Sequence, residues 1–343
     1  MNSSTKMSSE LLAERLLLWS LCLLFFFIPL ATSPAVIAGG AVIGIWLFSG
    51  KCIKDRHNWL NAEWFKPVIL FVTLHWAGLL WTNDIRTGIS FAEKSYYWLY
   101  AFAIASVSAE KNKTDIMFKA FISGLIIISL ISLFQLAGIL PIFKNFSTLY
   151  AGKPGKHISG SLLAVFGVSM LSFYFTETSR LRNKLIIICL MLVLSATIFL
   201  TESRAGYLVF IIASPLMLYN MLDKKHFKKL PILIVIIVVI IPLSPIVQNR
   251  LNKALDEIQL YRNGNPNTSI GLRLHMWEGA LKIFSEKPML GAGTGSYAAE
   301  MKKYAHPNLS PEFYILSQPH NSFLYVATSF GIIGLSVFIW LLY

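Results

Sequence analysis

Three cationic or ionisable side chains stand at the ends of apolar segments. Arg204 lies in the short polar junction 201–206, Arg273 opens an amphipathic stretch, and His320 directly precedes the last apolar block. A guanidinium presents a planar fork that fits phosphate oxygens in pairs, and an imidazole can accept a hydroxyl proton near neutral pH. These residue types favour transfer from a phosphate-activated donor over glycoside hydrolysis, which uses a pair of carboxylates.

Each of these residues also has a plainer interpretation. A charge near membrane depth is costly, so Arg204 is either an anion-binding group or an arginine that reaches lipid phosphates or pairs with Glu202. Arg273 is either a ligand for the same anion, helped by the N-terminus of its helix, or a solvated surface charge. His320 is either a general base or a satisfied polar group.

The composition excludes several classes of protein. Hydrophobic residues make up 55% of the chain and charged residues 14%, and the mean hydropathy is +0.60. Soluble domains carry about 25% charged residues, so neither an ordinary cytosolic enzyme nor a disordered chain fits. The net charge of +13 comes from Lys and Arg scattered between apolar blocks, so we expect contact with membrane lipids and no nucleic-acid partner. No CxxC, HExxH, GxGxxG or P-loop pattern occurs, and we expect no cofactor and no metal.

The apolar blocks predict an all-α polytopic membrane protein with about ten transmembrane helices, since a hydrocarbon core of about 30 Å needs roughly 20 apolar residues per crossing. The predicted helices are 16–33, 35–50, 67–82, 91–108, 120–140, 160–176, 185–200, 205–222, 230–247 and 321–343. Segment 91–108 carries Glu93 and Lys94 in its first turn. The chain stops at Tyr343 within an apolar run, so the tenth helix either ends the protein or is truncated.

The distribution of basic residues predicts the orientation. With the N-terminus in the cytoplasm, the cytoplasmic segments hold 16 Lys and Arg residues and the short loops opposite hold 6. The chain then divides into transmembrane helices over 1–247, a periplasmic loop domain over 248–319 and a last transmembrane segment over 320–343. Within the loop domain, helical spacing predicts two amphipathic helices, 250–261 and 272–284, on the membrane surface.

The segment that begins at His320 contains a recognisable motif. His320 and Asn321 are followed by nine residues, then Gly331, two isoleucines and Gly334. This resembles the H[NSQ]-x9-G-x-x-[GTY] signature of bacterial O-antigen ligases. Arg273, Trp277 and the segment 288–297 also resemble the outer-loop pattern of the superfamily that joins these ligases with O-antigen polymerases. The resemblance covers about 200–334, and the earlier helices match in hydropathy and topology only.

The resemblance implies a membrane glycosyltransferase of the GT-C type with about twelve helices, of which the last two are missing here. Such an enzyme moves O-antigen glycan from undecaprenyl pyrophosphate to lipid A–core at the periplasmic face of the bacterial inner membrane. By position, Arg204 and Arg273 would bind the donor pyrophosphate and His320 would activate the acceptor hydroxyl. Accessory contacts with the substrate would come from Asn321, Lys153 and Lys156. The alternative interpretation of Lys153 and Lys156 is that they are solvated residues of loop 141–159 without contact to the substrate.

Two alternatives remain at this point. An O-antigen polymerase would use a second lipid-linked glycan as acceptor, and the His-Asn-x9-Gly pattern favours the ligase. A transporter or flippase of lipid-linked glycans would carry ionisable groups at mid-membrane and show repeated halves. The sequence shows no such repeat, and its polar groups gather at one face.

Overall fold

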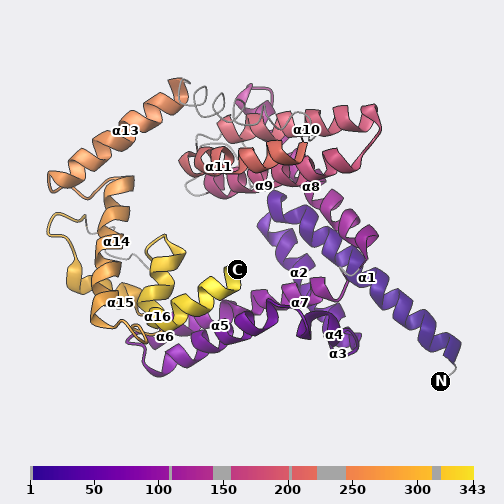
Figure 1. Cartoon of the computed structure of the whole chain (residues 1–343), viewed down its shortest axis with the longest axis horizontal. Helices are drawn as coiled ribbons and strands as arrows, with labels where there is room; N and C mark the ends of the chain where they lie inside the picture. Colours follow the sequence, from indigo (N-terminus) through magenta and orange to yellow (C-terminus); the bar gives the residue numbers. More distant parts are fainter. Residues whose placement is uncertain (1–2, 108–109, 142–155, 201–202, 222–244, 311–317) are drawn as a thin grey trace. The chain divides into compact units, whose positions relative to one another are not determined.

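The computed structural model describes residues 3–107, 110–141, 156–200, 203–221, 245–310 and 318–343. All regular elements among these residues are helices. They form two compact units, one from Met1–Gly50 with Val107–Arg250 and the other from Lys51–Ser106 with Leu251–Tyr343. Each unit therefore joins segments that lie far apart in the sequence (Figure 1).

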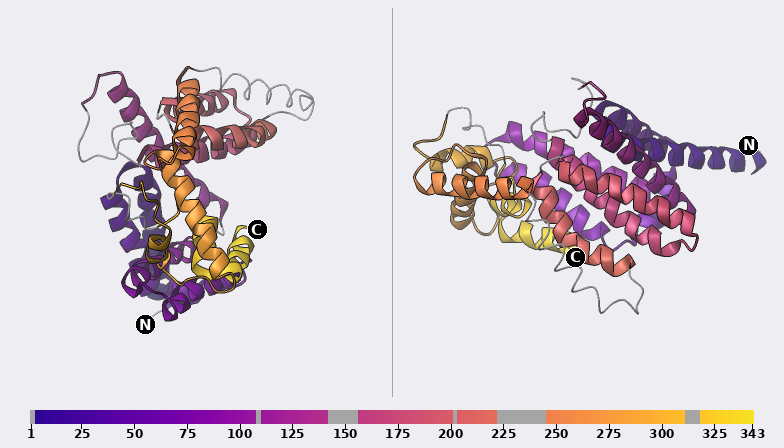
Figure 2. Two further views of the ribbon diagram at one scale, coloured as in Figure 1. Left: turned by 90° about the vertical axis from the view of Figure 1, so that its left-hand side faces the viewer. Right: turned by 90° about the horizontal axis from the view of Figure 1, so that it is seen from above.

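The first unit is a bundle of long apolar helices. It contains α1 (Ser3–Leu30), α2 (Thr32–Phe48), α8 (Lys111–Leu136), α9 (Lys156–Glu177), α10 (Leu181–Leu200), α11 (Arg204–Met221) and the first residues of α13 (Pro245–Arg262). Helix α9 packs against α10 and α11, and α1 packs against α2 and α8 (Figures 1 and 2). Leu125 and Ile128 of α8 and Leu194 and Ile198 of α10 are fully buried, because their spacing of three and four residues places each pair on one helix face.

The second unit combines one long apolar helix with shorter elements. It contains α3 (Lys51–Lys54), α4 (Arg56–Leu60), α5 (Phe65–Ala77), η1 (Gly78–Leu80), α6 (Ile85–Ala92), η2 (Glu93–Tyr97), α7 (Trp98–Ala105), the rest of α13, α14 (Ser269–Glu286), α15 (Tyr297–Met301), η4 (Lys302–Tyr304) and α16 (Ser322–Leu342). Helix α16 packs against both α5 and α14. The buried side of α14 includes Gly271, His275, Gly279 and Ile283, which recur every four residues.

The described helices agree with most of the predicted membrane segments. Five helices are long and apolar enough to cross a membrane, namely Glu10–Leu30, Lys111–Leu136, Ile158–Glu177, Leu181–Leu200 and Ser322–Leu342. Shorter apolar helices cover Thr32–Phe48, Phe65–Leu80 and Ala205–Met221. Together they overlap every predicted segment except 91–108 and 230–247. All but the last three residues of 230–247 lie outside the described part of the chain.

The structure differs from the sequence prediction over 91–108. Instead of one long helix it has the end of α6, the 3-10 segment η2 and the short helix α7. The charged pair Glu93 and Lys94 lies in η2, where the Lys94 ammonium sits 4.6 Å from the centre of the Phe91 ring. Two charged side chains within an uninterrupted apolar membrane helix would be energetically costly, which is the physical reason for the difference.

Two further expectations concern the loop domain. Helices α13 and α14 confirm the helices predicted over 250–261 and 272–284. Their position on the membrane surface and the periplasmic boundaries 248–319 stay predictions.

Candidate functional site

His320 occupies the turn that starts α16. Its backbone has φ 50°, which is unusual for a residue other than glycine and costs about 1 to 2 kcal/mol. The next residue, Asn321, caps the helix, because its side-chain oxygen accepts hydrogen bonds from the N–H groups of Phe323 (3.0 Å) and Leu324 (3.2 Å). The His320 side chain is exposed, and no group in the described residues hydrogen-bonds its ring. The side-chain oxygen of Asn321 is thus engaged in the cap, and an accessory role for this residue stays a prediction.

The glycine of the motif marks a break in α16. Gly331 has φ 63° and ψ −154°, and a Cβ there would lie 2.3 Å from the carbonyl oxygen of Met289. The break frees the carbonyls of Thr328 and Ser329, which accept hydrogen bonds from the N–H groups of Ala292 (2.7 Å) and Gly293 (3.0 Å). Only glycine fits this conformation and this close approach. The motif thus joins α16 to the glycine-rich segment 291–295.

The glycine-rich segment also contacts the end of α5 and the residues after it. The Thr294 hydroxyl donates to the carbonyl of His75 at 2.7 Å, and the Thr82 hydroxyl donates to the carbonyl of Thr294 at 2.7 Å. Gly293 has φ 93°, and a Cβ there would lie 2.7 Å from the carbonyl oxygen of Gly78. The segment therefore connects α5 with α16 through hydrogen bonds to backbone carbonyls.

A buried carboxylate reinforces this connection. Glu300 on α15 is 1% exposed, and it accepts hydrogen bonds from Asn83, Lys287 and Lys303. Burial alone would raise the pKa of Glu300, but the hydrogen bonds from the two lysines outweigh it and hold the pKa below its usual range. Glu300 is therefore ionised and ties the outer loop to the turn after α5.

His320 opens onto a hollow of about 470 Å³ within the second unit. The side chains around it come from α5, from the turn before α16 and from α16 itself. They are Phe71, His75, Gln318, Pro319, His320, Asn321, Ser322, Tyr325, Val326 and Phe338. Half of these residues are apolar or aromatic and half are polar or ionisable, so the walls combine apolar surface with several groups that can hydrogen-bond a ligand.

His75 is the residue in this hollow that the sequence analysis missed. It lies in the last turn of α5, and its Nδ1 is 2.8 Å from the carbonyl oxygen of Phe71. No motif surrounds it, so the only signal was an ionisable side chain inside a predicted membrane segment, which by itself suggests function. The structure brings it into the same hollow as His320.

Arg273 lies one turn into α14 and is exposed. It does not line the hollow at His320. The expected backbone donors at the N-terminus of α14 are already used, since the N–H of Gly271 donates to the Thr268 hydroxyl (3.0 Å) and the N–H of Ile270 donates to Glu257 (2.9 Å). These two amides are therefore engaged and are not available to an anion.

Arg204 belongs to the first unit, where it is the first residue of α11. The Tyr207 hydroxyl of α11 donates to the carbonyl of Phe199 at 2.7 Å and so connects α11 with α10. Glu202, the alternative partner of Arg204, lies outside the described residues. A shared site of Arg204 with the residues of the second unit stays a prediction.

The two lysines of loop 141–159 are also untested. Lys153 lies outside the described residues, and Lys156 is the first residue of α9. Their contacts with substrate stay predictions.

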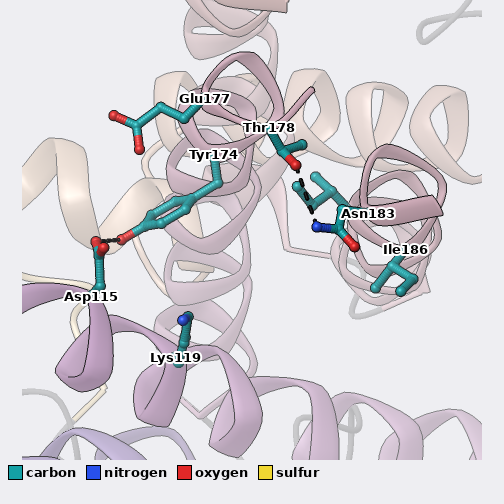
Figure 3. Close-up of a pocket in the computed structure, with 8 residues that line it drawn as sticks. Asp115, Lys119, Tyr174, Glu177, Thr178, Asn183 and Ile186 are labelled. Atoms are coloured by element: carbon teal, nitrogen blue, oxygen red, sulfur yellow. Dashed lines mark hydrogen bonds between the residues drawn. The ribbon is translucent and has the colours of Figure 1, made fainter. Parts of the chain in front are cut away.

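A separate hollow of about 380 Å³ lies in the first unit (Figure 3). Four of its polar side chains are paired: the Tyr174 hydroxyl donates to Asp115, and Asn183 donates to the Thr178 hydroxyl at 3.4 Å. Because these bonds connect α8 with α9 and brace the turn between α9 and α10, we assign this hollow a structural role. The hollow at His320 is the candidate functional site.

Comparison with known proteins gives a consistent result. Residues 186–339 match a family model described as O-antigen ligase. An O-antigen ligase of Escherichia coli (strain K12) is 39% identical over 107 residues, which cover 30% of this chain and 25% of that ligase. A protein of Haemophilus influenzae (strain ATCC 51907 / DSM 11121 / KW20 / Rd) is 25% identical over 215 residues, which cover 58% of this chain and 53% of that protein. The matches thus span between a quarter and about half of the relatives' own length.

Apolar helices in both units, five of them long enough to cross a membrane, define a multi-pass α-helical membrane protein. Residues 186–339 are therefore similar to the O-antigen ligase family, in agreement with the resemblance carried by the His320 motif.

Proposed function

We propose that this protein transfers O-antigen glycan from undecaprenyl pyrophosphate to lipid A–core at the periplasmic face of the bacterial inner membrane. The observation that carries the proposal is the position of His320, an exposed imidazole held at positive φ in a hollow large enough for a sugar. Strained backbone and an available base at one point are typical of a catalytic group.

In the proposed reaction the acceptor hydroxyl oxygen attacks the anomeric carbon of the donor glycan. The new glycosidic bond forms as the bond to the pyrophosphate oxygen breaks, with inversion at the carbon. The hydroxyl proton passes to His320, and undecaprenyl pyrophosphate departs with the bonding electron pair. Arg204 and Arg273 neutralise the charge that gathers on the leaving group, so no metal is required.

The structure of α16 supports this assignment of roles. The Asn321 cap, the Trp277 hydrogen bond to Pro319 at 3.0 Å and the break at Gly331 fix the backbone on both sides of the hollow. A fixed backbone on both sides of His320 holds the point from which its imidazole reaches the substrate, which favours proton transfer. A GT-C type bundle would place this end of α16 at the periplasmic surface.

The test is the lipopolysaccharide of a strain that lacks this protein. We expect loss of all long O-antigen chains, with accumulation of lipid-linked polymer. A core that carries a single repeat unit would instead indicate a polymerase. Unchanged lipopolysaccharide would contradict both assignments, and lipid-linked glycan trapped on the cytoplasmic face would indicate a flippase.

A further inference from the structure

His75 and His320 reach the same hollow from α5 and from the start of α16. We propose that His75 binds a sugar hydroxyl through its Nε2 atom and so holds a glycan beside His320. This inference rests on the proposed function and extends it, because it names a second polar contact for the sugar that enters the hollow.

The hydrogen bond of His75 fixes its tautomer. Its Nδ1 lies 2.8 Å from the carbonyl oxygen of Phe71, and a carbonyl oxygen only accepts, so Nδ1 carries the hydrogen. In the neutral ring Nε2 is then an acceptor. Among the described residues, no group hydrogen-bonds Nε2. Because the His75 ring lines the hollow, its Nε2 atom is an acceptor that a ligand in the hollow can use.

The ring of His75 is also held in place. Its centre lies 4.5 Å from that of Phe71 and 4.8 Å from that of Phe330, and the backbone carbonyl of His75 accepts from Thr294. A side chain fixed by its neighbours loses little conformational entropy when it binds a ligand. His75 is thus preorganised to accept one hydrogen bond in a defined direction.

The chemistry of the hollow selects a sugar. Pyrophosphate oxygens only accept hydrogen bonds, so they would be repelled by the lone pair on Nε2. A sugar hydroxyl, in contrast, can donate a hydrogen bond to Nε2. The rings of Phe71, Tyr325 and Phe338 line the same hollow and offer apolar faces to the C–H groups of a sugar. The donor glycan and lipid A–core both carry such hydroxyls. Measuring KM for each substrate separately shows which of the two His75 binds.

Two substitutions separate the proposed role from a structural one. In His75→Asn the amide N–H can replace Nδ1–H and keep the bond to Phe71, while the acceptor at Nε2 is lost. In His75→Gln the longer amide can place its oxygen near the position of Nε2, while the bond to Phe71 is lost. The matched control is His57→Asn, which makes the same change at an exposed histidine outside the hollow.

The experiment measures glycan transfer by the purified full chain in lipid nanodiscs, with lipid-linked glycan and lipid A–core varied separately. For His75→Asn we expect about a tenfold rise in KM for one of the two substrates, in keeping with the loss of one hydrogen bond. His75→Gln should stay within about threefold of the parent, and His57→Asn should equal it. The substrate whose KM rises identifies the glycan that His75 binds.

Other outcomes would overturn the proposal. A normal His75→Asn together with an impaired His75→Gln would show that only the bond to Phe71 matters. Equal loss in both variants without a change in either KM would also assign His75 to the packing of α5.

Failure of the proposed function has a different signature, because the parent chain then transfers no glycan at all. In that case binding of fluorescent lipid A–core and of lipid-linked glycan to the nanodiscs decides the matter. If His75→Asn binds lipid A–core or lipid-linked glycan more weakly than the parent protein does, the inference stands. If the variant and the parent bind both ligands equally, or if neither protein binds them, the inference is wrong.

Discussion

The indole N–H of Trp277 donates a hydrogen bond of 3.0 Å to the backbone carbonyl of Pro319. Trp277 lies on α14 four residues after Arg273, and Pro319 directly precedes His320. One bond therefore connects the helix of the predicted pyrophosphate ligand with the turn of the predicted base.

We expect Trp277→Phe to lower glycan transfer about threefold to tenfold while the protein accumulates normally. Phenylalanine keeps an aromatic ring but lacks the indole N–H, and one such hydrogen bond contributes about 0.5 to 1.5 kcal/mol. Transfer rates of purified protein measure the effect. The control is Trp340→Phe, at an exposed tryptophan near the other end of α16. Equal activity of both variants would show that the bond does not position His320.

His320→Ala should abolish ligation while the protein still inserts and accumulates normally. Loss of a general base costs about 10² to 10⁴ in rate, and an exposed side chain at the mouth of the hollow tolerates truncation. Lipopolysaccharide profiles and membrane abundance are measured together, with His57→Ala as the control. Near-normal ligation by a well-expressed variant would make His320 a structural residue.

Arg204→Lys and Arg273→Lys should each lose activity about tenfold to a hundredfold, and the parent should stay active in excess EDTA. Lysine keeps the charge but cannot form the paired hydrogen bonds of a guanidinium with phosphate, each of which is worth about 1.5 to 3 kcal/mol. Transfer assays with and without chelator measure both effects. The mechanism is ruled out if Mg²⁺ restores an activity that EDTA abolished, or if the lysine variants equal the parent.

Gly331→Ala should destabilise the protein, whereas Gly44→Ala should not. At Gly331 the backbone has φ 63° and a Cβ would lie 2.3 Å from a carbonyl oxygen, while at Gly44 a Cβ would meet nothing within 4 Å. The positive φ alone costs a residue with a Cβ about 1 to 2 kcal/mol. Melting temperature in detergent and abundance in the membrane report the difference. Parent-like melting of Gly331→Ala would mean that the break in α16 is dispensable.

The predicted orientation requires a reporter after Lys225 to be cytoplasmic and a reporter within 262–268 to be periplasmic. The excess of Lys and Arg on the predicted cytoplasmic side, 16 residues against 6, is the reason. Fusions to an enzyme that is active only in the periplasm measure this directly. Both reporters on the same side would break the assignment of helices and separate Arg204 from the loop domain.

The sequence by itself determined the class of protein and the place of His320. Apolar blocks such as 185–200 and 321–343 correspond to α10 and α16, because in lipid every backbone polar group must be satisfied within its own segment. Helix formation there depends on local composition, which a sequence shows. The motif at His320 likewise consists of residues close together in the chain, so it could be recognised without the partners that Thr328 and Ser329 find at 292–293.

Tertiary structure decided which distant groups meet. His75 lines the hollow with His320, the amides that open α14 are engaged by Thr268 and Glu257, and segment 91–108 breaks into short elements. None of these follows from periodicity, which tells which side of a helix is apolar but not which partner covers it. Such pairings depend on packing between segments that are remote in the chain, and that packing exists only once the helices have assembled.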